Sequence, residues 1–248
     1  MKSLKKIIIY TIICSAPLIT LPKQLNYSVE FKDSEENIWL LTEVTVNEAI
    51  SSYYLLFYPI LIIKKLMGKL NDSEYTENIS EIELYKLIND KNQYIATIYP
   101  KGRYTMDHNA KITESINGEI YFLYLLSNDR GNGKLIISKY IPPNKIISKV
   151  LIKYSARNTI YQYSIIKDND ILIVIYSNRS VPGTDEGIYF QILQEDLNTK
   201  YIDKISDDRV AFATEIKLYS NNNIITVEWI SDFDNKSYKR EININNCK

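Results

Sequence analysis

The sequence predicts an all-β, β-propeller-like fold with about four four-stranded blades and an apolar insertion in the first blade. Three observations support this prediction. Similar segments recur at intervals of about 50 residues in the second half of the chain. Each copy contains short β-branched and aromatic runs separated by polar turns, which is the pattern of antiparallel hairpins. Strands of this length cannot bury both faces alone, whereas radial stacking of four-stranded sheets buries them and leaves only short edges.

The repeat is clearest in three hairpin-like segments. They span residues 112–124, 163–176 and 214–229, and each ends on an aromatic side chain. A polar loop and a further strand-like run follow each segment. These runs cover residues 134–141, 188–193 and 237–244, and two copies add a fourth run at 146–154 and at 201–205. The alternative interpretation is a β-sandwich, or another antiparallel sheet, in which this spacing arose by chance.

The first half of the chain fits the repeat less closely. Strand-like runs at 26–31, 37–44, 82–88 and 94–99 flank an insertion at 45–78. The apolar part of the insertion, residues 53–67, is interrupted by Pro59, and we expect it to be a buried strand or short helix. The alternative is a surface that contacts a membrane or a partner protein.

The predicted propeller domain runs from residue 25 to 248. Its blades are expected at about 25–100, 109–157, 158–209 and 210–248. The last blade lacks an obvious outer strand, and the amino-terminal end is the candidate to supply it and close the ring.

Residues 1–24 have the pattern of an export signal or signal anchor. Lysines at positions 2, 5 and 6 precede an apolar run from Ile7 to Leu21. This run is shorter than the ~20 residues that span a bilayer, so a cleaved signal is favoured over an anchor. Lipidation at Cys14 and a buried first strand are the alternatives. We therefore expect a secreted, periplasmic or cell-surface protein, with this segment as the candidate point of membrane contact.

Composition excludes several classes of function. The chain has 30 Lys and Arg against 30 Asp and Glu, so its formal net charge is zero and it lacks the basic surplus of nucleic-acid-binding proteins. It has one His and two Cys, too few for a Cys/His zinc site or a disulfide scaffold. Paired acids in the loops fail the spacing of calcium motifs and are expected to form turns. The sequence predicts no cofactor and no metal.

Two local patterns resemble families of exported propellers. The segment Ser127-Asn128-Asp129-Arg130-Gly131 resembles the start of the Asp box of sialidase-like propellers, although Lys134 stands where that box has Trp. The segment from Tyr176 through Arg179 to Ile188-Tyr189-Phe190-Gln191 resembles a repeat of bacterial secreted propellers, with a longer loop. An Asp box stabilises a hairpin turn, so the resemblance implies a fold and not an activity.

No complete catalytic set is recognisable. His108 is the sole histidine and lies in a polar turn, so we expect a surface residue and not a catalytic one. A sialidase requires an arginine cluster and a Tyr/Glu nucleophile pair. The Phe-Arg-Ile-Pro-type signature of sialidases is absent, and Gly102-Arg103-Tyr104 is its nearest substitute.

The preferred hypothesis is an exported, non-catalytic propeller that recognises a protein or a glycan through the loops at one end of its blades. The candidate ligand-binding residues are Arg103, Arg130, Arg179, Asp129 and Asp185. One alternative is a sialidase-like glycoside hydrolase, in which arginines and a Tyr/Glu pair converge at the channel mouth. The other is a partial propeller subunit that an oligomer completes.

Overall fold

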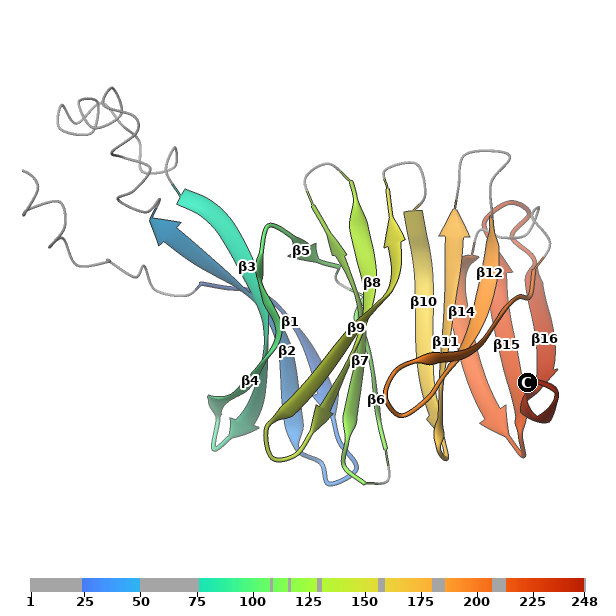
Figure 1. The fold of residues 1–248 in the computed structure, drawn as a ribbon, viewed down its shortest axis with the longest axis horizontal. Helices are drawn as coiled ribbons and strands as arrows, with labels where there is room; N and C mark the ends of the chain where they lie inside the picture. The colour runs from blue at the N-terminus through green and yellow to red at the C-terminus, as the bar shows by residue number, and fades with distance from the viewer. Residues whose placement is uncertain are drawn as a thin grey trace, which may run out of the picture.

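The computed structural model describes residues 24–49, 76–107, 109–115, 117–128, 131–155, 159–179, 186–206 and 213–247. These residues form antiparallel β-sheets joined by turns and loops, and they include one short 3-10 helix, η3 (Ile244–Asn246), near the carboxyl end (Figure 1). Within these ranges, no helix has the length and apolar character needed to cross a membrane.

Four sheets follow one another along the chain. The first sheet contains β1 (Gln24–Lys32), β2 (Ile38–Ala49), β3 (Thr76–Ile88) and β4 (Lys91–Gly102). The second contains β5 (Thr105–Met106), β6 (Lys111–Glu114), β7 (Ile120–Ser127), β8 (Gly133–Ile141) and β9 (Lys145–Tyr154). The third contains β10 (Thr159–Asp168), β11 (Ile171–Arg179), β12 (Gly187–Leu193) and β13 (Thr199–Lys204). The fourth contains β14 (Ala213–Asn221), β15 (Ile224–Ser231) and β16 (Ser237–Asn243).

Within each sheet the strands pair antiparallel with their neighbours in the chain, apart from β5 and β6. Both of these short strands pair with β7: Met106 lies opposite Leu126 at its end, and Glu114 lies opposite Ile120 at its start. They are two pieces of one interrupted strand, so the second sheet has the four-stranded plan of the first and third.

Turn chemistry explains where the strands reverse. The β3–β4 and β14–β15 hairpins turn on Asn89-Asp90 and Asn222-Asn223, and all four residues have positive φ. Two-residue hairpin loops need this conformation because it matches the twist of the flanking strands, and Asn and Asp tolerate it better than most residues.

The β1–β2 turn is organised by the carboxylate of Asp33. It accepts hydrogen bonds from the backbone N–H groups of Glu35 (3.0 Å) and Asn37 (2.8 Å) and from Nε1 of Trp39 (2.8 Å). Partial burial acts to raise the pKa of Asp33, but these hydrogen bonds outweigh it and lower the pKa below its ordinary value. The carboxylate therefore ties the turn to the rim of the first core.

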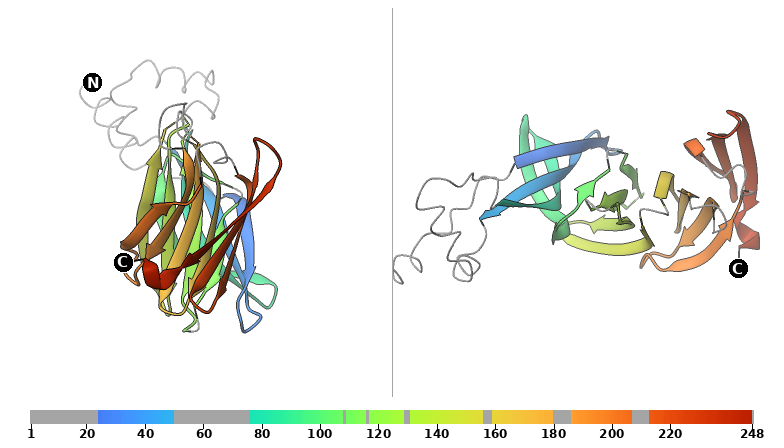
Figure 2. Two further views of the ribbon diagram at one scale, coloured as in Figure 1. Left: turned by 90° about the vertical axis from the view of Figure 1, so that its right-hand side faces the viewer. Right: turned by 90° about the horizontal axis from the view of Figure 1, so that it is seen from above.

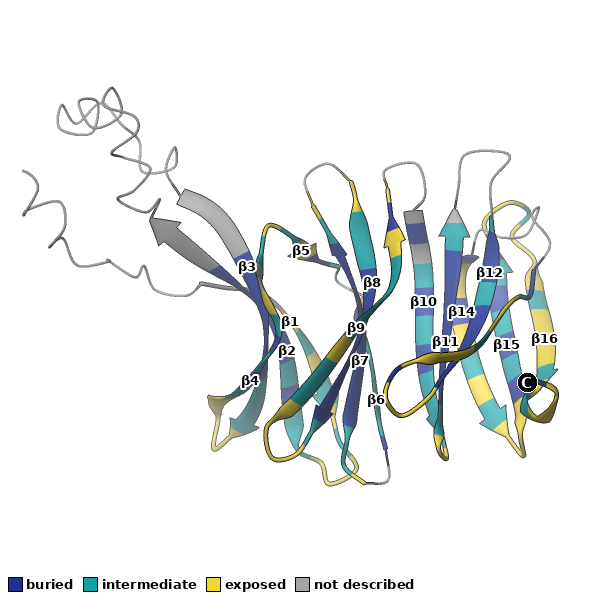
Figure 3. Ribbon diagram, in the orientation of Figure 1, coloured by how far each residue is buried: buried dark blue, intermediate teal, exposed yellow. Residues whose placement is uncertain are grey.

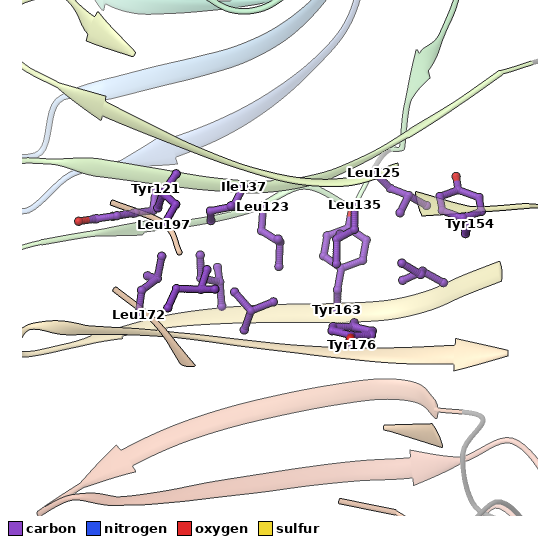
Figure 4. Close-up of a cluster of buried hydrophobic side chains, with 14 residues drawn as sticks. Tyr121, Leu123, Leu125, Leu135, Ile137, Tyr154, Tyr163, Leu172, Tyr176 and Leu197 are labelled. Carbon is purple, nitrogen blue, oxygen red and sulfur yellow. The ribbon is translucent and has the colours of Figure 1, made fainter. Parts of the chain in front are cut away.

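Three hydrophobic cores fill the spaces between successive sheets. The core between the first and second sheets includes Leu41 and Phe122. The core between the second and third includes Leu123 and Tyr163. The core between the third and fourth includes Phe190 and Trp229. Figure 4 shows the middle core, with side chains of β7 and β8 meeting those of β10 and β11. Each fully buried large side chain of this kind contributes about 1.5–3 kcal/mol. Three cores between four sheets confirm the predicted propeller-like fold class and exclude a two-sheet sandwich.

Burial differs between the middle and the end of the array (Figure 3). In β7 every residue from Ile120 to Leu126 is buried, because sheets cover both of its faces. In β15, buried residues alternate with less buried ones, so one face packs on the third sheet and the other faces away from it.

The four sheets form an open row and not a closed ring. Figures 1 and 2 place the first and fourth sheets at opposite ends of the array. The last sheet has three strands among the described residues. Residues 24–32 pair with β2 in the first sheet, so they do not form a fourth strand of the last sheet. Their register on β2 commits them to the other end of the row. The rest of the amino-terminal end, which was the candidate to close the ring, lies outside the described residues.

The insertion in the first sheet is shorter than the sequence suggested. β2 and β3 continue as a regular ladder to the pair Ala49–Thr76, so both ends of the predicted insertion 45–78 are strand. The apolar run 53–67 and the predicted export signal, apart from Gln24 in β1, lie outside the described residues.

Candidate functional site

A cavity of about 460 Å³ lies where the end of β4 meets the ends of β7, β8 and β9, between the first and second sheets. The described lining residues are Tyr99, Pro100, Gly102, Arg103, Tyr104, Leu126, Ser127, Asn128, Asn132, Gly133, Lys134, Lys153 and Tyr154. They comprise three tyrosines, three cationic side chains and two amides, and none of these described residues is acidic. Tyrosine rings pack against the apolar face of a ligand ring, and the cationic side chains attract negative charge. Such a lining favours a ligand that has a ring and also carries negative charge.

The wall from the first sheet is built around Tyr104. Its ring meets Tyr99 edge to face, with centroids 5.4 Å apart, and its hydroxyl donates a hydrogen bond to the carbonyl of Pro100. A Cβ on Gly102 would lie 2.5 Å from the Tyr104 ring, so only glycine permits this close approach. Burial is the main cause that raises the pKa of Tyr104. The phenol is therefore a protonated structural donor.

The wall from the second sheet is built around Tyr154. Its hydroxyl donates to the carbonyl of Leu126 at 3.3 Å, and a Cβ on Gly133 would lie 2.1 Å from that hydroxyl oxygen. Burial raises the pKa of Tyr154 as well. Glycines thus admit a tyrosine ring on each side of the cavity.

Positive charge gathers on this part of the second sheet. Lys134 on β8 lies directly opposite Lys153 on β9, and both line the cavity together with the exposed Arg103. Side chains directly opposite on neighbouring strands have Cβ atoms about 5 Å apart, and like charges in that position destabilise the pair. A bound anion would relieve the repulsion.

The β7–β8 turn contributes two amide side chains. Asn128 accepts a hydrogen bond from the N–H of Asn132 through its Oδ1 at 3.0 Å, and Gly131 has a φ of 72°. This is the segment that resembles an Asp box. Lys134, which replaces the Trp of that box, lines the cavity.

The predicted ligand-binding residues have different outcomes. Arg103 lines the cavity. Asp129, Arg130 and Asp185 lie outside the described residues. Arg179 ends β11 opposite Thr159, and its side chain is likewise outside the description. For these four residues the proposed role remains a prediction.

Sequence reasoning missed most of the cavity lining. The missed residues come from three separate stretches of the chain, and no motif unites them: Tyr99 and Tyr104, Lys134, and Lys153 and Tyr154. The one available signal was Lys134, because a cation at a position that usually carries a core aromatic indicates an unusual environment.

The arginine cluster of the sialidase alternative is not seen among the arginines whose side chains are described. Arg103 lines the cavity. Arg240, on β16 of the fourth sheet, instead donates to the carbonyl of Ile205, the residue that follows β13, at 3.4 Å. The predicted surface residue His108 lies outside the described residues. Among the described residues, no three His, Cys, Asp or Glu side chains gather closely enough to hold a metal ion.

A tyrosine–carboxylate pair does occur among the described residues, but neither of its members lines the cavity. The hydroxyl of Tyr163 donates to Oδ2 of Asp107 at a long 3.5 Å. Burial, followed by the charge of Asp107, raises the pKa of Tyr163. The long hydrogen bond leaves the two groups loosely paired in this structure.

The fold and this site together define a β-propeller-like protein with a cationic, tyrosine-lined cavity between its first two sheets. No family model matches the chain, and no curated protein matches it. Among solved structures it is similar to the polysaccharide lyase Uly1, with 7% identity, a TM-score of 0.40, and coverage of 89% of this chain and 58% of the lyase. It is also similar to a Hadza microbial sialidase, with 8% identity, a TM-score of 0.36, and coverage of 92% and 55%. The chain therefore spans somewhat more than half the length of each.

Proposed function

We propose that this protein is a non-catalytic binding module that holds an anionic sugar of a glycan in the cavity between the first and second sheets. The observation that carries the proposal is the lining itself. Tyrosine rings suit the apolar faces of a sugar, and amides suit its hydroxyls. Arg103, Lys134 and Lys153 suit a carboxylate or sulfate. The sequence pattern of residues 1–24 supports placing this activity outside the cytoplasm.

The protonation and hydrogen bonding of the two tyrosine hydroxyls favour a binding role over hydrolysis. Tyr104 and Tyr154 donate their protons to backbone carbonyls and have raised pKa values, so they hold the walls in place. A hydrolase would need an acid and a nucleophile facing the same sugar. The described lining provides cations and amides for recognition.

An open array is favoured over a ring completed by a second subunit. The outward face of the fourth sheet carries ion pairs along its strands, with Lys217 paired to Glu215 on β14 (3.1 Å) and Lys239 paired to Glu241 on β16 (2.9 Å). Packing another blade on this face would remove these charges from water, which is costly. The face suits the solvated end of an array.

The test is a titration of the purified protein with a tetrasaccharide of alternating glucuronate and N-acetylglucosamine, with neutral chitotetraose as the comparison. We expect binding of the acidic sugar that weakens with salt. Lys153→Gln should lower the affinity about tenfold, equivalent to about 1.4 kcal/mol.

Lys145→Gln is the matched control, because it removes the same charge from the other end of β9 and Lys145 does not line the cavity. Equal binding of the neutral sugar, or equal effects of the two substitutions, would overturn the proposal.

A further inference from the structure

The carboxylate of Glu43 links the first sheet to the second beside the cavity. Glu43 lies on β2 and is 4% exposed. Its Oε2 accepts the backbone N–H of Met106 in β5 at 2.7 Å, and its Oε1 accepts the hydroxyl of Ser80 in β3 at 2.8 Å. A buried carboxylate is costly unless such donors satisfy it, so this contact is a specific feature of the fold.

The residue that Glu43 holds, Met106, follows a cavity wall in the chain, two positions after the lining residue Tyr104. Met106 ends the segment 102–106, which carries Arg103 and Tyr104 into the cavity. Glu43 acts beside other attachments of this stretch of chain: Oγ1 of Thr105 donates to the carbonyl of Ser127 at 3.5 Å, and the N–H of Asp107, the next residue, donates to the carbonyl of Leu125 at 2.9 Å. β5 is only two residues long, with Thr105 opposite Ser127, and the Tyr104 hydroxyl donates to the carbonyl of Pro100 in β4.

Charge connects Glu43 to the same wall. Glu43 is among the negative groups that act, after burial, to raise the pKa of Tyr104. Glu43 acts on Tyr104 less than burial, Tyr124, Tyr99 and Glu81 do, so the hydrogen bond to the Met106 amide is its main link to this wall.

We propose that Glu43 is a positioning residue of the binding site: by holding the Met106 amide, it fixes the wall that presents Arg103 and Tyr104 to the sugar. The inference rests on the proposed function. A wall that is already ordered before binding costs less entropy when the ligand arrives, so loosening it lowers affinity without removing any group that touches the ligand.

The protein contains a chemically similar but solvent-exposed contact at the other end of the same boundary. Glu114 on β6 accepts the backbone N–H of Ser34 at 2.8 Å and its hydroxyl at 3.3 Å. This carboxylate also joins the first and second sheets through one N–H and one serine hydroxyl. It does not line the cavity, so its removal tests the linkage of the sheets without touching the site.

The experiment compares Glu43→Gln, Glu43→Ala, Ser80→Ala and Glu114→Ala in two measurements. Hydrogen exchange of the Met106 and Ser34 amides reports the two contacts. Titration with the glucuronate-containing tetrasaccharide reports the site. Ser80→Ala removes a single neutral donor and serves as the variant that should fold if Glu43→Ala does not.

We expect Glu43→Ala to speed exchange at Met106 and weaken binding about tenfold, as the loss of one charge-assisted hydrogen bond would. Glu43→Gln should restore most of the affinity, because its amide can accept from Met106 and donate to Ser80. Ser80→Ala should weaken binding less than Glu43→Ala. Glu114→Ala should speed exchange at Ser34 and leave affinity unchanged.

Faster exchange at Met106 with wild-type affinity in Glu43→Ala or Ser80→Ala would overturn the positioning role and leave the proposed site standing. Equal loss of affinity in Glu114→Ala would also overturn the positioning role. Loosening the boundary between the two sheets at any point would then lower affinity, whichever carboxylate is removed. Failure of the wild-type protein to bind the acidic tetrasaccharide overturns the proposed function itself.

Discussion

Substitution of Gly133 by alanine tests the geometry of the cavity wall directly. An alanine Cβ would lie 2.1 Å from Oη of Tyr154 and 2.2 Å from the carbonyl oxygen of Leu126. Real Cβ atoms do not approach other heavy atoms this closely, and the Leu126 carbonyl is backbone, so a side-chain rotation cannot relieve the clash. Strands β7, β8 and β9 would have to move apart at this end.

The expected cost follows from two contributions. Overpacking of a tight site costs about 1–3 kcal/mol. The hydrogen bond from Tyr154 to Leu126 is also strained or lost, and a buried polar group without a partner costs about 1–3 kcal/mol. We expect Gly133→Ala to lower the free energy of unfolding by about 2–6 kcal/mol, the sum of the two contributions.

The assay is urea denaturation followed by tryptophan fluorescence, with far-ultraviolet circular dichroism as the second probe. Gly118→Ala is the control. Gly118 has a φ of 72° and nothing within 4 Å of its added Cβ, so alanine there suffers only the left-handed backbone cost of about 1–2 kcal/mol. A loss in Gly133→Ala no larger than in Gly118→Ala would refute the close approach.

Two further predictions concern the turns. Because the pKa of folded Asp33 lies below its ordinary value of 3.8, its carboxylate stabilises the protein above that pH, and the contribution is lost as the pH falls through the folded-state pKa. Asp33→Asn should therefore lower stability at pH 7 by about 1 kcal/mol and flatten the decline below pH ~4, measured as urea midpoints; an unchanged pH profile would contradict the role of Asp33. Asn223→Gly should raise the free energy of unfolding by about 0.5 kcal/mol, because glycine adopts positive φ without penalty. Asn221→Gly, within β14, should instead lower it, and equal effects would count against the turn assignment.

The hairpins were predictable because their determinants are local. The segment 163–176 reads as two β-branched runs around a polar turn, and the structure has β10 and β11 there, with Asn169 at positive φ in the turn. Side-chain alternation and turn residues act over a few neighbours, so they can be read without knowing what packs on the sheet.

The cavity was largely hidden from the sequence. Arg103 was singled out, but Lys134 and Lys153 become a site only when their strands pair in register and the first sheet brings Tyr104 beside them. Glu43 has no motif either. Its role depends on reaching Met106, which follows it by more than sixty positions and belongs to another sheet.

The sequence by itself determined an all-β chain of short hairpins repeated along its length, because strand periodicity and turn conformation are properties of adjacent residues. The tertiary structure alone decided that the row stays open, that β1 belongs to the first sheet, and that a cationic cavity lies between the first two sheets. Those outcomes depend on which faces pack together and in what register, and side chains distant in the chain settle both through burial and hydrogen bonding.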